Sequence, residues 1–221
     1  MSLVVHEHPF AMYSWKALIA LHERDVPFTV ALVEADTSQL TALWPPTTMP
    51  VLVDDGVVVP ESSIIVEHLD GHGAAPPLVP ADPAAALQAR LRDRVVDGHV
   101  STPVQKIVGD ALRPDDARDQ HGTVQAHAAL DIAYATLNGQ LAGREHDGWL
   151  AGDAFTLADC AAAPALFYAE LVHPLDRGAH SALAAYRARL EARPSVARVI
   201  DEARPYRHLF PLPWPAEVAV A

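Results

Sequence analysis

The first eighty residues alternate between patterns typical of strands and patterns typical of helices. Short runs rich in β-branched residues occur at 3–6, 28–33, 49–54 and 56–60. Segments with apolar residues at helical spacing lie between and after them, at 14–24, 38–44 and 61–69. The order βαβ, helix, ββ, α predicts a small mixed sheet covered by helices, which is an α+β fold.

The pattern changes after residue 70. Residues 71–83 are rich in glycine, alanine, aspartate and proline, and they indicate a connection between domains. Strand character is missing beyond it, and five segments are predicted to be helices: 84–112, 115–139, 157–171, 180–192 and 195–203. We therefore expect one domain over 1–73, a linker over 74–83 and an all-helical domain over 84–221.

Composition and charge narrow the possible roles. The 221 residues carry a formal net charge of −12, which argues against general nucleic-acid binding. The apolar run around 161–167 is far shorter than the roughly 20 residues of a membrane span, and no secretory signal is visible. Cys160 is the single cysteine, so an intrachain disulfide is excluded and a reducing cytoplasm is the expected location.

Twelve histidines raise the question of a metal. His6 and His8 flank one residue at the end of a strand, and His68 and His72 lie at the end of a helix. Neither pair comes with the carboxylate–histidine spacing of a metalloprotease. The spacing favours solvated or locally hydrogen-bonded histidines, and we predict no metal.

A proline opens the predicted strand 49–54. One interpretation of Met49-Pro50 is an ordinary trans proline at the start of a strand. The other is a cis bond that turns the backbone N–H and C=O of Met49 outward, where an extended peptide can pair with them.

An acidic and a hydroxyl residue, Glu61 and Ser62, open the helix that follows the hairpin. Backbone N–H groups at a helix start carry positive partial charge, so a ligand carboxylate can bind there beside the Ser62 hydroxyl. Glu61 could hold an α-amino group of the same ligand. The alternative is that both residues only cap the first turn.

Together these segments resemble the glutathione-binding half of the glutathione-transferase superfamily. The resemblance rests on the proline-opened strand, the Asp55-Gly56 hairpin turn and the Glu61-Ser62 helix start. Tyr-Ser-Trp-Lys at 13–16 is similar to the active-site turn of that family. Gly-Asp-Ala-Phe-Thr-Leu-Ala-Asp at 152–159, with a capping-box pattern, supports it, and the resemblance covers roughly residues 3–210.

The resemblance implies a thioredoxin-like N-terminal domain and a glutathione transferase that activates the thiol of glutathione, its co-substrate, for attack on a small, mostly apolar electrophile. Met49, preceding Pro50, would hold the cysteinyl unit of glutathione through its backbone. Glu61 and Ser62 would hold the γ-glutamyl end. A detoxification role and a homodimer are also implied, while the net charge and the short apolar runs predict neither nucleic-acid nor membrane partners.

Two departures from the family pattern leave alternatives open. Ala11 occupies the usual position of a catalytic serine, so Tyr13 and Ser14 are the candidate catalytic hydroxyls, against packing and capping roles. Thr47-Thr48 stand where relatives commonly have Gly-Lys, and a lysine there would help to hold the glycyl carboxylate. The alternatives are a non-catalytic binding or interaction module, or an enzyme using another low-molecular-weight thiol such as mycothiol.

Cys160 follows the capping-box pattern within a run of alanines. A catalytic thiol needs an electropositive and accessible setting. The surrounding sequence favours a buried small hydrophobe at this position.

Overall fold

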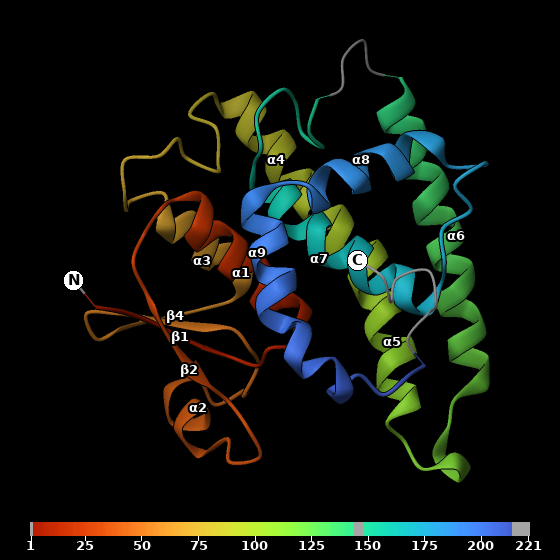
Figure 1. Ribbon diagram of the computed structural model, residues 1–221, viewed down its shortest axis with the longest axis horizontal. Helices are drawn as coiled ribbons and strands as arrows, with labels where there is room; N and C mark the ends of the chain where they lie inside the picture. Colours follow the sequence, from red (N-terminus) through yellow and green to blue (C-terminus); the bar gives the residue numbers. More distant parts are fainter. Residues whose placement is uncertain (1, 144–147, 214–221) are drawn as a thin grey trace.

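The structure is a computed structural model that describes residues 2–143 and 148–213. A four-stranded sheet with three helices forms the N-terminal part, and helices alone form the rest (Figure 1). This confirms the predicted fold class, a thioredoxin-like domain followed by an all-helical one. Among the described residues, no helix is long and apolar enough to cross a membrane.

The sheet has the strand order β2-β1-β3-β4. Its strands are β1 (Leu3–Glu7), β2 (Thr29–Leu32), β3 (Val51–Asp54) and β4 (Val57–Pro60). β1 pairs in parallel with β2 and antiparallel with β3, and β3 pairs antiparallel with β4. Asp55 and Gly56, both with positive φ, make the tight β3–β4 turn that the sequence predicts.

Helices cover both faces of the sheet because neighbouring strand residues point to opposite sides. The helices are α1 (Met12–Glu23), α2 (Ser38–Leu43) and α3 (Ser62–Leu69). Leu52 and Val59 belong to the large core that contains the buried residues of α1 and α3. Val51 packs instead with Leu40 of α2 in a separate small core.

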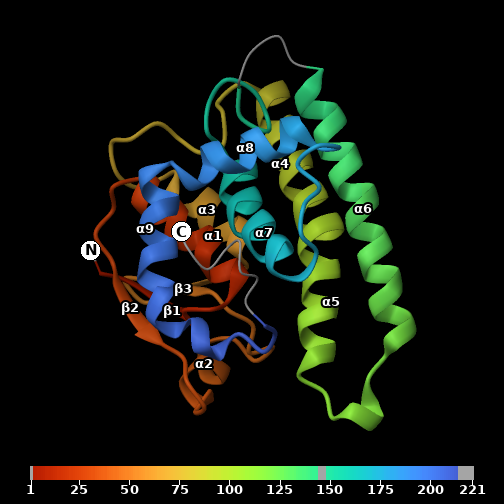
Figure 2. The ribbon, with the colours of Figure 1, turned by 45° about the vertical axis from the view of Figure 1, so that its right-hand side comes forward.

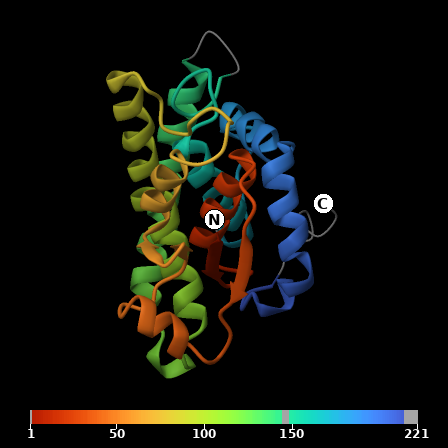
Figure 3. The same cartoon turned by 90° about the vertical axis from the view of Figure 1, so that its left-hand side faces the viewer.

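The α-helices described in the C-terminal part are α4 (Pro83–Val96), α5 (Thr102–Ala111), α6 (Gln120–Ala142), α7 (Leu157–Val172), α8 (Ser181–Glu191) and α9 (Pro194–Ala203), with short 3-10 helices at Asp115–Ala117 and Arg204–Leu209. The segment predicted as one helix over 84–112 is two helices, joined by a π-helical stretch at Asp97–Ser101. α5 and α6 run alongside each other (Figure 2). α1 and α3 lie between α4 and α9 in the view of Figure 3.

Helix α7 forms the centre of the molecule. Every residue from Leu157 to Leu171 is buried, and α7 packs against both α1 and α4. Thr156 and Asp159 make the predicted capping box, and Asp159 also accepts hydrogen bonds from the Leu150 N–H at 2.8 Å and the Tyr186 hydroxyl at 2.6 Å. Cys160 is fully buried beside it, and burial raises its pKa well above the usual value.

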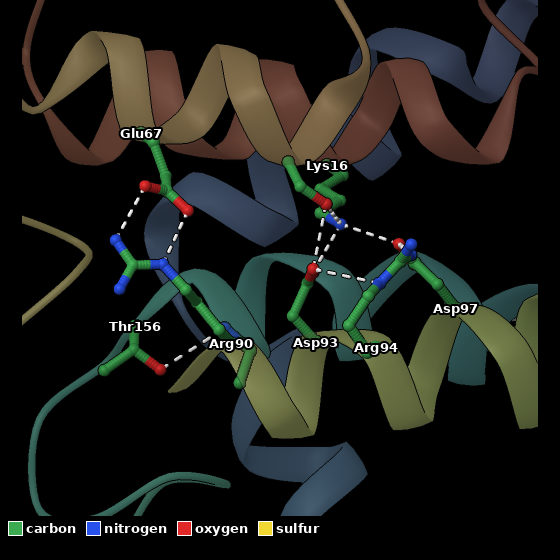
Figure 4. A network of polar contacts seen from close by, with 9 residues as sticks. Lys16, Glu67, Arg90, Asp93, Arg94, Asp97 and Thr156 are labelled. Carbon is green, nitrogen blue, oxygen red and sulfur yellow. Dashed lines mark hydrogen bonds and ion pairs between the residues drawn. The ribbon is translucent and has the colours of Figure 1, made fainter. Parts of the chain in front are cut away.

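A buried lysine joins the two parts of the chain (Figure 4). Lys16 of α1 is ion-paired with Asp93 of α4 and, at 3.0 Å, with Asp97 of the π-helical stretch. Ser63 of α3 accepts from the Lys16 ammonium at 2.8 Å and donates to Asp93 at 2.8 Å. Because Lys16 and Asp93 are almost completely buried, this network fixes α1 and α3 against α4.

Candidate functional site

A cleft of about 1170 Å³ lies between the two parts of the chain. Its N-terminal side is formed by residues 10–13, 47–50 and 61–64, and its other side by residues of α4, α5 and α7. Five of the six predicted site residues line this one cleft: Tyr13, Met49, Pro50, Glu61 and Ser62. The three segments, far apart in sequence, are brought together because α1, β3 and α3 pack on one another.

The segment before β3 offers unpaired backbone groups to the cleft. The Met49–Pro50 peptide bond is cis. Within the described residues, the N–H and C=O of Met49 have no hydrogen-bond partner. An extended ligand can pair with such groups as an added strand does.

The N-terminus of α3 also opens into the cleft. Glu61 has φ 69° and ψ 116°, a sparsely populated conformation of the kind that clusters at functional sites. Its side chain is exposed and makes no capping hydrogen bond, so Glu61 does not cap the helix through its side chain. The Ser62 side chain lies at the first turn, where the leading N–H groups have no intrahelical partners. This end of α3 can therefore accept an anionic group.

The two candidate hydroxyls of α1 point in different directions. Tyr13 lines the cleft, and its pKa is raised to about 12, first by burial and then by the charge of Asp97. Ser101 hydrogen-bonds to the Tyr13 hydroxyl and opposes that rise. Ser14 is fully buried, does not line the cleft, and its hydroxyl has no partner among the described residues. The geometry thus separates Ser14 from the other predicted residues.

An apolar wall faces these polar groups. It is formed by Val104, Val108, Leu112, Leu157 and Tyr168, and Phe10 adds an aromatic ring on the N-terminal side. The Tyr168 ring is buried, and it also borders the cleft. Its hydroxyl has no hydrogen-bond partner among the described residues. Sequence spacing could not find this wall, because its members come from segments that are far apart in the sequence.

The cationic side chains that line the cleft are already paired. Arg90 makes a two-point ion pair with Glu67, at 2.8 and 2.7 Å. Arg94 donates to Asp97 at 2.5 Å. Thr48, at the position where a lysine was considered, accepts a hydrogen bond from the Trp44 indole at 2.9 Å. A second carboxylate of a ligand would meet no unpaired cation among the described lining residues.

Comparison with known proteins places this geometry in a family. Residues 10–72 match the family model for the glutathione S-transferase N-terminal domain, and residues 105–189 match that for the C-terminal domain. The chain belongs to the glutathione S-transferase family. The match includes both sides of the cleft, and it confirms the resemblance inferred from the sequence.

Relatives in this family differ in what their names describe. A glutathione S-transferase from Methylobacterium radiotolerans, solved in complex with glutathione sulfonate, is 30% identical, with TM-score 0.79, over 90% of this chain and 95% of that one. The FtsZ-localized protein A of Caulobacter vibrioides is 31% identical over 72% of this chain and 73% of its own length. A stringent starvation protein A homolog from Coxiella burnetii is 27% identical over 75% of each.

Proposed function

We propose that this chain is a glutathione transferase that binds glutathione in the cleft and activates its thiol for attack on a small, mostly apolar electrophile. The observation that carries the proposal is the convergence of Met49, the α3 N-terminus and Tyr13 on one cleft with an apolar opposite wall. The relative solved with glutathione sulfonate supports the choice of thiol.

Each anchor has a chemical counterpart in glutathione. The free N–H and C=O of Met49 pair with the cysteinyl backbone, as in strand addition. The first N–H groups of α3 and the Ser62 hydroxyl hold the γ-glutamyl carboxylate, and the exposed Glu61 carboxylate holds the adjacent ammonium. These contacts leave the thiol near the start of α1, where Tyr13 lies.

Tyr13 supplies the hydrogen-bond donor for the thiolate. Since its pKa is raised to about 12, the phenol stays protonated at neutral pH and can donate. A free thiol has a pKa near ~8.5, and lowering it by ~2 units corresponds to about 2.7 kcal/mol of preferential stabilisation of the thiolate. The thiol proton leaves to solvent as the thiolate forms. The thiolate then forms a C–S bond with the electrophilic carbon, which either releases a leaving group, such as chloride from chlorodinitrobenzene, or in an addition leaves a carbanion that takes a proton from solvent. The apolar wall orients the second substrate.

A second candidate function is a non-catalytic glutathione-binding module. It is favoured by Ala11, the residue before α1, which carries no hydroxyl and leaves the α1 N-terminus without a side-chain cap. Two relatives carry names that describe no transferase reaction. Both functions require the same residues for binding glutathione. They differ in whether Tyr13 activates the bound thiol.

The decisive experiment combines retention on immobilised glutathione with turnover of chlorodinitrobenzene. The transferase predicts retention, measurable turnover, and a loss of about 100-fold in kcat/KM for Tyr13→Phe with retention unchanged. Tyr206→Phe, a tyrosine outside this cleft, is the matched control and keeps full activity. Retention without turnover establishes the binding module.

The identity of the thiol is tested with the same protein. Because the cleft has no unpaired cation for a glycyl carboxylate among its described residues, Thr48→Lys is expected to tighten glutathione binding. Thr48→Ser is the control, because it changes the same side chain without adding a charge. If the protein turns over mycothiol and not glutathione, mycothiol takes the place of glutathione as the co-substrate in the proposal. The mechanism at Tyr13 stays the same.

A further inference from the structure

Two histidines and an aspartate converge at the end of α3 opposite to Ser62. Asp54 is the last residue of β3, His68 lies in the last turn of α3, and His72 follows the helix. The Oδ2 of Asp54 lies 2.8 Å from Nε2 of His68 and 3.1 Å from Nε2 of His72. The two Nε2 atoms are 3.3 Å apart. One atom of each side chain thus forms the corner of a small triangle.

We propose that Asp54, His68 and His72 form a binding site for a borderline divalent cation such as Zn²⁺. Zinc binds imidazole nitrogen and carboxylate oxygen at roughly 2.0–2.2 Å, which puts ligand atoms about 3.3 Å apart in a tetrahedron. The observed edges of 2.8, 3.1 and 3.3 Å are at or just below that separation. Outward shifts of a few tenths of an ångström would seat the ion.

The ligands are held before an ion arrives. Asp54 is fixed at the end of a strand paired on both sides, with Leu3 and with Val57. The buried Arg24 donates to the carbonyls of Leu69 and His72, which anchors the turn after α3. Pre-positioned ligands favour binding because little conformational freedom is lost when the ion is bound.

The partial burial of the three side chains suits an ion that has three protein ligands and one coordination position open to solvent. The Asp54 and His72 side chains are 13% and 14% exposed, and that of His68 is 30% exposed. Three protein ligands leave a fourth position of a tetrahedron for water, and the exposed side of His68 gives access to it.

The site joins two elements that also reach the cleft. β3 begins beside Pro50 and ends at Asp54, while α3 begins at Ser62 and carries His68 about 9 Å further along its axis. An ion bound by both would tie the hairpin to the end of α3. It would stabilise the thioredoxin-like domain whether or not that domain binds a thiol.

This proposal departs from the sequence analysis, which predicts no metal. His68 and His72 are recognisable as a pair in the sequence. The carboxylate of Asp54 comes from a strand, fourteen positions before His68. The plain alternative is that both imidazoles only donate hydrogen bonds to Asp54. Asparagine at position 54 keeps an oxygen that accepts such bonds and removes the charge that a cation needs, so Asp54→Asn separates the two.

The test is titration of the tag-free, chelator-treated full chain with ZnCl₂ by calorimetry, with Co²⁺ as a spectroscopic substitute. The wild-type chain is expected to bind one ion and to melt at a higher temperature with Zn²⁺. Asp54→Asn and His72→Asn are each expected to weaken binding by more than about 100-fold, since even outer-shell partners of metal ligands cost 10- to 100-fold. The d–d absorption bands of bound Co²⁺ should be absent in both variants.

His127→Asn is the matched control, because His127 also lies against a second histidine, His173, with Nδ1 atoms 3.0 Å apart. It should leave the zinc affinity unchanged. Equal affinity in wild type and both site variants, or loss of binding in His127→Asn alone, would overturn the proposal. Melting curves without metal report folding of each variant, and if Asp54→Asn unfolds, His72→Asn carries the conclusion.

Discussion

Replacing Lys16 by methionine tests whether the buried ion network holds the two parts of the chain together. Methionine fills the volume of the lysine stem but leaves Asp93 and Asp97 buried without their shared cation. Breaking a buried pair by removing one partner costs about 3–5 kcal/mol, because the remaining charge is left uncompensated.

The surrounding contacts place the expected loss at the lower end of that range. Ser63 still donates to Asp93 at 2.8 Å, and Arg94 still pairs with Asp97 at 2.5 Å. We therefore expect Lys16→Met to lower the free energy of unfolding by about 3 kcal/mol. For a chain of this length, that corresponds to a fall of about 6–12 °C in melting temperature.

The loss should depend on pH. Burial raises the pKa of Asp93, and Lys16 opposes the rise, so removing Lys16 raises that pKa further. The folded protein then binds more protons than the unfolded chain, and stability increases as pH falls through the raised pKa. The deficit of Lys16→Met should be largest at about pH 8 and smaller at about pH 5.

Urea denaturation of wild type and variant across this pH range measures the effect. Lys106→Met, which removes the partly exposed partner of Asp119, is the control and should cost much less. A Lys16→Met deficit no larger than that of Lys106→Met, or one that does not change with pH, would refute the reasoning.

Three further outcomes are expected. Gly73→Ala should lower stability by about 2–5 kcal/mol, because Gly73 has φ 69° and a Cβ there would lie 2.4 Å from the Arg24 carbonyl oxygen; Gly139→Ala in α6, with open space around it, should not. Burial, and then Glu202, raises the pKa of Glu7 to about 7, so protonation of Glu7 should add stability as pH falls from about 8 to about 5, and the melting temperature of wild type relative to that of Glu7→Gln should rise over this range. Cys160 should resist a thiol reagent until the chain is denatured, as mass spectrometry would show.

Local sequence patterns predicted the elements whose cause is local. The Asp55-Gly56 turn and the capping box at Thr156 each depend on residues within a few positions of one another. The break between α4 and α5 was missed, because the π-helical stretch continues the helical path and changes only its hydrogen-bond spacing.

The sequence identified residues that the structure brings to one cleft, but it did not show which way their side chains point. Tyr13 and Ser14 are neighbours on α1, about 100° apart around the helix axis, and only the docking of α1 decides which one reaches the cleft. The pairing of Asp54 with His68 likewise depends on how β3 and α3 pack. Sequence spacing carries no information on such contacts between elements.

The charges around the cleft determine how strongly Tyr13 must stabilise a bound thiolate. Asp97 raises the pKa of Tyr13 more than Arg94 lowers it, so the electrostatic field of the nearby charges favours the protonated hydroxyl. A thiol bound beside that hydroxyl would feel the same field, which disfavours its thiolate. The opposing contributions are the N–H groups at the start of α3 near Ser62 and the hydrogen bond from Tyr13 itself. In the proposed mechanism, thiol activation therefore depends on hydrogen bonding, and removing the Asp97 charge should lower the pKa of a bound thiol while Tyr13→Phe raises it.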